Sequence, residues 1–245
     1  MNQQPPSPAP TRWVAWWVGT WLVGVTAGSL VIGLLHAPSR PDDAAGPGDV
    51  LAAPIGVLGA SLVALWTAYL VGMWLASERL GSGSFASDYG VRFAPVDLLG
   101  LPIGVATQLA VVPLLYLPLE AIWPETFADD RLADTAQDLV DRADGGLIVL
   151  LFALVVVGAP VVEELFFRGF LQRPLLAAST RPGQRAMVVV AVALVFGAIH
   201  FRPVELPGLA MVGVVLGVCA WRTDRLGMPI AAHVSFNATG VVLAL

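Results

Sequence analysis

The sequence GLIVLLFALVVVGAPVVEELFFRGFLQ, residues 146–172, decides the fold of this chain. It is apolar over most of its length, and it exceeds the roughly 20 apolar residues that a helix needs to cross a bilayer. The whole chain has the same character, because 57% of its 245 residues are hydrophobic and 13% are charged. A soluble domain carries about 25% charged residues, so the sequence predicts a protein of the lipid bilayer.

Apolar stretches on both sides of this segment predict an all-α, polytopic transmembrane bundle of about seven spans. The spans are expected at roughly Trp13–Leu35, Val50–Ala76, Val96–Leu117, Gly146–Gln172, Ala186–Phe201, Pro207–Trp221 and Met228–Leu245. Residues 1–12 are polar and rich in proline, which is typical of a disordered tail. Residues 13–245 are expected to form one domain, with Trp13, Trp16 and Trp17 as an aromatic anchor at the membrane interface.

The arginines predict the orientation of the bundle. All thirteen basic residues are arginine, and a cytoplasmic N-terminus places eight of them inside, four outside and Arg168 within a span. This bias fits the positive-inside rule. We therefore expect a cytoplasmic N-terminus, and a bacterial cell membrane as the location. The inside arginines are Arg12, Arg79, Arg92, Arg173, Arg181, Arg185, Arg222 and Arg225, and the outside ones are Arg40, Arg131, Arg142 and Arg202.

The remaining composition excludes several classes. The net charge of −5 arises from acids concentrated in the loop at 120–145, so no nucleic-acid partner is expected. The apolar residues of that loop recur at helical spacing, which predicts either a surface helix on the membrane or a solvated loop helix. The single cysteine, Cys219, excludes an internal disulfide.

Ionisable residues within the spans are the candidates for function, because each costs about 2.5–3.5 kcal/mol to insert into a membrane. Glu164 and Arg168 lie four residues apart, in the favourable order for an ion pair on one helical face. Glu163 points about 100° away on the helix, so its carboxylate is free to accept a proton. Pro160 precedes the cluster and predicts a kink.

Two later spans add polar groups at the same four-residue spacing. The fifth span ends VFGAIHF and places His200 four residues after Phe196. The seventh begins GMPIAAHVSFN and places His233 and Asn237 on one helical face. Such groups are rare in lipid unless they function, so we expect these residues and Glu163 to share one site.

Taken together, these segments resemble the CPBP family of intramembrane proteases, which includes the type II CAAX prenyl endopeptidases and bacteriocin-processing or immunity proteins. The family pattern is Glu-Glu-x-x-x-Arg, then Phe-x-x-x-His, then His-x-x-x-Asn. The matching residues, in order, are Glu163, Glu164, Arg168, Phe196, His200, His233 and Asn237.

The resemblance implies an endopeptidase that cleaves membrane-associated or lipidated, CAAX-like peptides near the cytoplasmic face. By this resemblance, Glu163 and His200 would activate a water molecule. Glu164 and Arg168 would hold the helix geometry. His233 and Asn237 would stabilise the oxyanion. No serine or cysteine lies beside a base, which disfavours a covalent intermediate. The expected partners are the lipid bilayer and a peptide or lipidated protein substrate.

Three alternatives stay open at this point. Glu163, His200 and His233 could hold a catalytic zinc, with Glu164 as the base. The protein could instead be a non-catalytic membrane scaffold or bacteriocin-immunity protein. It could also be a proton-coupled transporter, since an acid and two histidines in a membrane can relay protons.

The depth of the candidate residues sets a geometric condition. At 1.5 Å per residue, a fifth helix that begins at the membrane surface near Arg185 would place His200 about 22 Å deep, beyond the reach of the other groups. We therefore predict either that this helix begins outside the hydrocarbon core or that a deep polar cavity opens from the cytoplasm.

Overall fold

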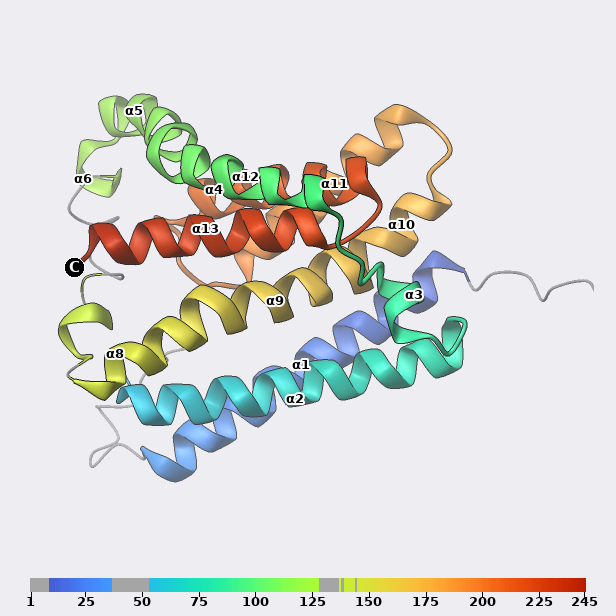
Figure 1. Cartoon of the computed structure of the whole chain (residues 1–245), viewed down its shortest axis with the longest axis horizontal. Helices are drawn as coiled ribbons and strands as arrows, with labels where there is room; N and C mark the ends of the chain where they lie inside the picture. Colours follow the sequence, from blue (N-terminus) through green and yellow to red (C-terminus); the bar gives the residue numbers. More distant parts are fainter. Residues whose placement is uncertain (1–8, 37–52, 128–136, 138, 144) are drawn as a thin grey trace, which may run out of the picture.

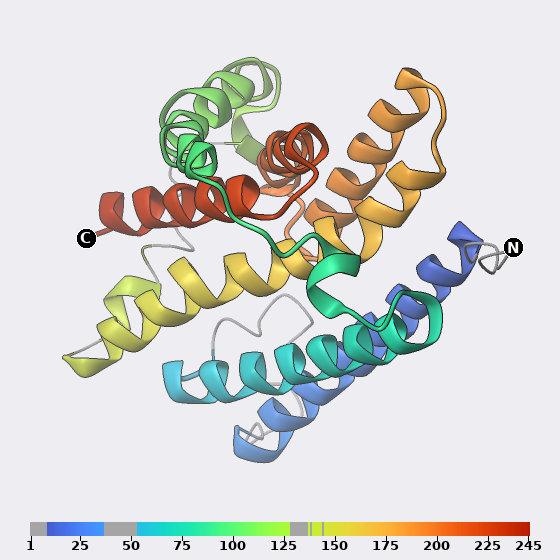
Figure 2. The ribbon, with the colours of Figure 1, turned by 45° about the vertical axis from the view of Figure 1, so that its right-hand side comes forward.

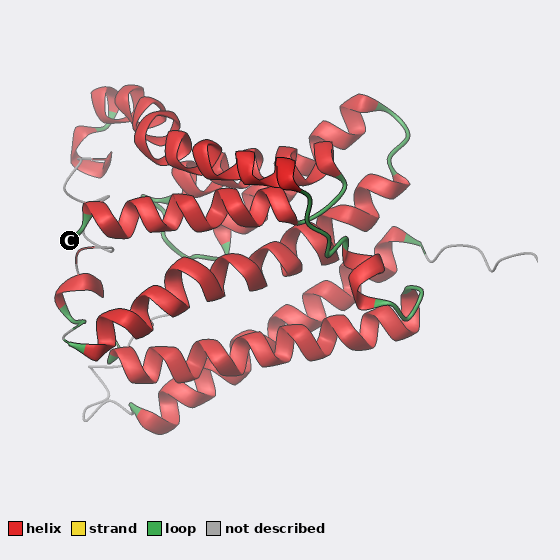
Figure 3. Ribbon diagram, in the orientation of Figure 1, coloured by secondary structure: helices red, strands yellow, loops and turns green. Residues whose placement is uncertain are grey.

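The computed structural model describes residues 9–36, 53–127, 137, 139–143 and 145–245. Within these ranges the regular structure is entirely helical, so the predicted all-α class is confirmed (Figures 1 and 3). The elements are α1 (Pro10–Leu35), α2 (Ile55–Leu80), α3 (Phe85–Tyr89), η3 (Pro95–Leu99), α4 (Gly100–Ala106), η4 (Thr107–Val111), α5 (Val112–Ile122), α6 (Pro124–Phe127), α8 (Gly146–Leu151), η5 (Phe152–Gly158), α9 (Ala159–Glu163), η6 (Glu164–Gln172), α10 (Arg173–Ala178), α11 (Pro182–Ala198), α12 (Leu206–Thr223) and α13 (Gly227–Leu243).

Several of these helices are long and apolar enough to cross a bilayer, which makes the protein an integral membrane protein. In the described part of the chain, five stretches qualify by length and composition: Pro10–Leu35, Ile55–Leu80, Pro95–Ile122, Gly146–Ala177 and Leu206–Thr223. The apolar helices α11 and α13 have 17 residues each and fall below that length. The count of seven spans and the cytoplasmic N-terminus therefore stay predictions.

The predicted spans agree with the helices to within a few residues at most ends. The first begins at Pro10 and not at Trp13, and residues 1–8 of the predicted tail lie outside the described part. The fifth was placed at 186–201, whereas α11 covers Pro182–Ala198. Phe201 has a φ of +54°, outside the right-handed helical region, so the helix does not reach the predicted end.

The packing of α1 against α2 depends on small residues. A side chain at Gly24 would collide with the Tyr69 ring, and one at Gly72 would collide with Thr20. Small residues let transmembrane helices approach closely, so α1 and α2 form a tight antiparallel pair. Figures 1 and 2 show this pair beside the chain of helices from α8 to α10.

The aromatic core lies where the α1–α2 pair meets η6. Phe166, Phe167 and Phe170 are almost completely buried there, and Tyr69 stacks on Phe166 at a centroid distance of 3.8 Å. Trp17, predicted as part of an interfacial anchor, is 5% exposed, and its indole Nε1 donates a hydrogen bond to the Phe166 carbonyl at 3.1 Å. Trp17 therefore does not face the lipid as an anchor would, because its side chain is buried against η6.

The predicted surface helix of the acidic loop lies mostly outside the described residues. Of its described part, 137 and 139–141 are helical, and Leu139 is buried in a cluster with Ile55, Leu58 and Leu151. This short segment therefore packs on the ends of α2 and α8 through its apolar side.

Candidate active site

The centre of the candidate site is an ion pair without solvent contact. Arg168 Nη1 donates to Glu164 Oε1 at 2.9 Å, and both side chains are fully buried. The second terminal nitrogen of Arg168 donates to the Gly213 carbonyl at 3.2 Å. The predicted pair is present, and it ties η6 to α12. Glu164 is therefore engaged in a structural contact that holds η6 and α12 together.

His233 connects the two glutamates. Its Nδ1 lies 2.9 Å from Glu164 Oε1, and its Nε2 lies 3.8 Å from Glu163 Oε2. Because a buried carboxylate accepts, the Nδ1–H donates to Glu164 and leaves Nε2 directed toward Glu163. The expected partner of Glu163 was His200. The imidazole nearest to Glu163 belongs to His233, because α13 passes directly beside α9.

Glu163 differs from its neighbour in exposure and in partners. Its side chain is 24% exposed, whereas that of Glu164 is 0% exposed. The 3.8 Å contact to His233 exceeds hydrogen-bond length, so the two groups are not bonded directly and one water could bridge them. Of the two carboxylates, Glu163 is the one open to a water, and its role as a base stays a prediction.

Phe196 joins the two histidines. Its ring lies 4.9 Å from the His200 ring and 5.9 Å from the His233 ring, and the Arg168 guanidinium lies 4.7 Å from its centroid. His200 Nδ1 donates to the Phe196 carbonyl at 2.7 Å, one helical turn back. This bond leaves His200 Nε2 for a ligand, and it gives a physical reason for the four-residue spacing between Phe196 and His200.

Asn237 replaces a missing backbone hydrogen bond. The helix around η5 has bonds to the fifth preceding carbonyl, as from Ala159 N–H to Leu154. At the same spacing, Val155 would accept from residue 160, which is a proline without an N–H. Asn237 Nδ2 donates to the Val155 carbonyl at 2.8 Å instead. The kink predicted at Pro160 is thus a π-helical turn closed by α13, the kind of turn often found at functional sites.

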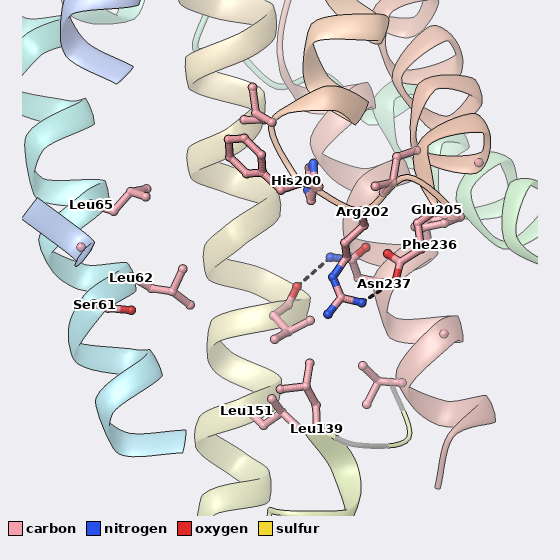
Figure 4. A pocket seen from close by; sticks show the side chains of 18 of the residues that line it. Ser61, Leu62, Leu65, Leu139, Leu151, His200, Arg202, Glu205, Phe236 and Asn237 are labelled. Carbon is pink, nitrogen blue, oxygen red and sulfur yellow. Dashed lines mark hydrogen bonds and ion pairs between the residues drawn. The ribbon is translucent and has the colours of Figure 1, made fainter. Parts of the chain in front are cut away.

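His200 and Asn237 also line the larger cavity of the described structure, which has a volume of about 560 Å³. Figure 4 shows both side chains in its wall together with Arg202 and Glu205, which form an ion pair. Most of the other lining residues are apolar, among them Leu62, Leu65, Leu139, Leu151 and Phe236. Glu163 and His233 are not in this wall. The cavity therefore borders the glutamate cluster on the side of His200 and Asn237.

The analysis of the sequence did not select Arg202 and Glu205 as part of the site. Arg202 was predicted only as an arginine outside the membrane and Glu205 was not singled out, whereas the two side chains pair in the turn between α11 and α12. Tyr116 was missed as well. Its hydroxyl donates to the Val204 carbonyl at 2.8 Å and accepts from Gly208 N–H at 3.1 Å. It thereby holds the segment after His200 against α5.

The cavity lies in the half of the bundle opposite to the predicted one. It is lined by Val25, Gly28 and Ile32 from the second half of α1 and by Ser61 and Leu62 from the first half of α2. If the N-terminus is cytoplasmic, this cavity lies in the half of the bundle away from the cytoplasm. The predicted orientation and a cytoplasmic opening therefore do not both hold for this cavity. The helical spacing of the polar residues gave no information on which side the bundle opens.

The zinc alternative was tested on the positions of its expected ligands. In the described residues, no three or more His, Cys, Asp and Glu side chains gather closely enough to hold a metal ion. Glu163 and His233 approach each other, but His200 faces the cavity from the far side of Phe196. The three residues proposed as ligands do not fit a zinc site, and we derive no catalytic step through a metal.

Comparison with known proteins supports the motif analysis. Neither the curated proteins nor the solved structures gave a match to this chain. A family model described as type II CAAX prenyl endopeptidase Rce1-like matches residues 145–239. That range contains all of the motif residues from Glu163 to Asn237. The resemblance drawn from the three motifs is confirmed, and residues 145–239 of this chain match the Rce1-like family of type II CAAX prenyl endopeptidases.

Proposed function

We propose that this protein is an intramembrane endopeptidase in which Glu163 activates a water molecule for attack on a peptide carbonyl. The observation that carries the proposal is the contrast between adjacent carboxylates. Glu164 is bound by Arg168 and His233, whereas Glu163 is partly exposed and has a single contact of 3.8 Å, to His233. A general base needs a carboxylate that is free to take a proton, and only Glu163 meets that condition.

His233 supports the same step. Glu164 accepts the Nδ1 proton and fixes the imidazole, as an acid fixes the histidine of a hydrolytic triad. Nε2 and the Glu163 carboxylate then face each other across a gap that suits one water. In this arrangement Glu163 accepts the water proton while His233 orients the oxygen. This differs from the assignment by resemblance, which pairs Glu163 with His200.

The carbonyl would enter from the cavity, past His200 and Asn237. One amide hydrogen of Asn237 is used by Val155, and the other is available to a developing oxyanion. Protonated His200 would donate from Nε2 to the same region or to the leaving amine. Preorganised donors of this kind supply a large part of the rate in acyl transfer.

The apolar walls favour a lipidated or amphipathic peptide as substrate. Pockets of about 300–1,000 Å³ suit small molecules or chain segments, and the cavity of about 560 Å³ is lined mainly by leucine, valine and isoleucine with polar groups at one end. A CAAX-like peptide that carries a prenyl chain has matching chemistry.

The test is cleavage of a fluorogenic farnesylated CAAX peptide by the purified full-length protein in detergent. Glu163→Gln keeps the shape of the side chain but removes the base, so cleavage should fall by about 10²- to 10⁴-fold. The matched control is Glu78→Gln, which neutralises an exposed carboxylate at the end of α2 and should leave the rate unchanged. Wild-type cleavage should also persist in a metal chelator.

Two outcomes would contradict the proposal. If Glu163→Gln cleaved as fast as the wild type, Glu163 would not be the base. If folded wild-type protein cleaved neither the farnesylated peptide nor its unmodified counterpart, the scaffold alternative would be favoured.

A further inference from the structure

A second cavity, of about 460 Å³, lies at the arginine-rich end of the bundle. It is bounded by α10, the first turns of α11, the end of α12 and the turn that leads into α13. Its lining includes Arg173, Arg185, Trp221, Asp224 and Arg225. Of the motif residues only Arg168 reaches this cavity, and Glu163, His200, His233 and Asn237 are not in its wall, so the proposed endopeptidase activity does not account for it.

The ion pairs around the cavity leave positive charge in excess. Arg173 and Arg92 share one carboxylate, since their terminal nitrogens lie 2.6 and 3.5 Å from the oxygens of Asp224. Arg225 is neutralised separately by Asp97 at 2.8 Å. Arg185 donates from Nε to the Ser179 carbonyl at 3.1 Å and forms no ion pair within the described residues. Arg92 and Arg173 together carry one positive charge more than Asp224 balances, and Arg185 adds a second.

Two buried polar atoms next to this cavity lack partners. Arg168 Nε and Gln172 Oε1 have no hydrogen-bond partner among the described residues, although each side chain is only 1% exposed. Both residues line the cavity. Both atoms are closed off from solvent, so they do not reach a ligand in the cavity. The excess positive charge of the arginines is therefore the observation that favours an anionic ligand.

We propose that this cavity binds the phosphate ester headgroup of an anionic membrane lipid. Arginine recognises phosphate oxygens with charge-assisted hydrogen bonds, and basic pockets between transmembrane helices suit anionic headgroups. Trp221 in the wall is typical of the membrane interface, where such a headgroup lies. The phosphate of such a headgroup would lie against Arg173 and Arg185 in the cavity wall.

The experiment measures lipid binding to the purified full-length protein by native mass spectrometry, with phosphatidylglycerol, phosphatidylcholine or inorganic phosphate added. We expect one phosphatidylglycerol to bind at least ten-fold more tightly than phosphatidylcholine. Arg185→Gln should weaken it about ten-fold, because a charge-assisted hydrogen bond is lost. Arg181→Gln is the matched control, since Arg181 is exposed on the same loop but does not line the cavity.

A second variant locates the bound headgroup. Ala177→Trp fills part of the cavity without changing its charge, so it should weaken phosphatidylglycerol binding as Arg185→Gln does, while thermal unfolding shows that both variants remain folded. If inorganic phosphate at millimolar concentration binds as well as the lipid, the phosphate site holds but its source is the free ion. Equal binding of both lipids with no effect of phosphate, or equal weakening by Arg181→Gln and Arg185→Gln, would overturn the proposal.

Discussion

The two parts of the candidate site differ in how their polar groups are satisfied. Around Glu164, the side chains of Arg168 and His233 are buried and both bind its Oε1. In the cavity wall, His200 uses one ring nitrogen and Asn237 one amide hydrogen for a backbone carbonyl, which leaves the other ring nitrogen and the other amide hydrogen for a ligand. A buried network of this kind fixes geometry, whereas an open wall can bind. The contrast predicts that substitutions in the network affect folding and that those in the wall affect catalysis.

The largest effect on stability is expected for Arg168→Met. It leaves Glu164 buried with only a histidine as partner, and breaking a buried ion pair from one side costs about 3–5 kcal/mol. The double variant Glu164→Gln/Arg168→Met removes both charges and should recover most of this loss. The measurement is the free energy of unfolding in mixed micelles. Equal destabilisation by the single and double variants would show that the charges do not interact as a closed pair.

A substitution in the wall should behave in the opposite way. His200→Ala removes one hydrogen bond, so the free energy of unfolding should change by about 1 kcal/mol. The cleavage rate should nevertheless fall by about 10²-fold or more, because a proton donor near the scissile bond is lost. Rate and unfolding are measured on the same preparation. The comparison between network and wall would fail if this variant unfolded as easily as Arg168→Met.

The smallest effect is expected at the bond between Asn237 and Val155. Hydrogen bonds between membrane helices contribute about 0.6 kcal/mol on average and up to about 1.7, so Asn237→Ala should destabilise the protein by that amount. Adding Pro160→Ala supplies an N–H that can reach the Val155 carbonyl.

The double variant Pro160→Ala/Asn237→Ala should therefore regain stability without regaining activity. Unfolding and cleavage assays on the two single variants and the double variant separate these roles. Recovery of activity together with stability would show that Asn237 acts only on the backbone.

The spans and the internal partners of the fourth span were predictable because they depend on local spacing. Apolar length defined most helices to within a few residues, and the four-residue interval identified the Glu164–Arg168 pair. The end of α11 was missed because the apolar run continues through Ile199 and Phe201, whereas the backbone leaves the helix there and Phe201 has a φ of +54°. That error put His200 inside a helix, whereas it lies in the turn after α11.

The position of His233 between two glutamates could not be predicted from spacing. It depends on how α13 crosses α9 and η6, and close crossings of this helix are set by glycines at distant positions, such as Gly100 and Gly104 of α4. The composition of the cavity wall has the same origin, because the wall combines residues of α1, α2, α5 and α13 that lie far apart in the sequence.

The α1–α2 pair contributes to the shape of the cavity but not to the polar groups of the candidate site. The polar groups of the site lie within the stretch that matches the family, residues 145–239, whereas part of the opposite cavity wall is contributed by α1 and α2, outside that stretch. In the proposed endopeptidase, mutations in the first 80 residues can therefore reshape the space for an apolar chain while every motif residue stays unchanged.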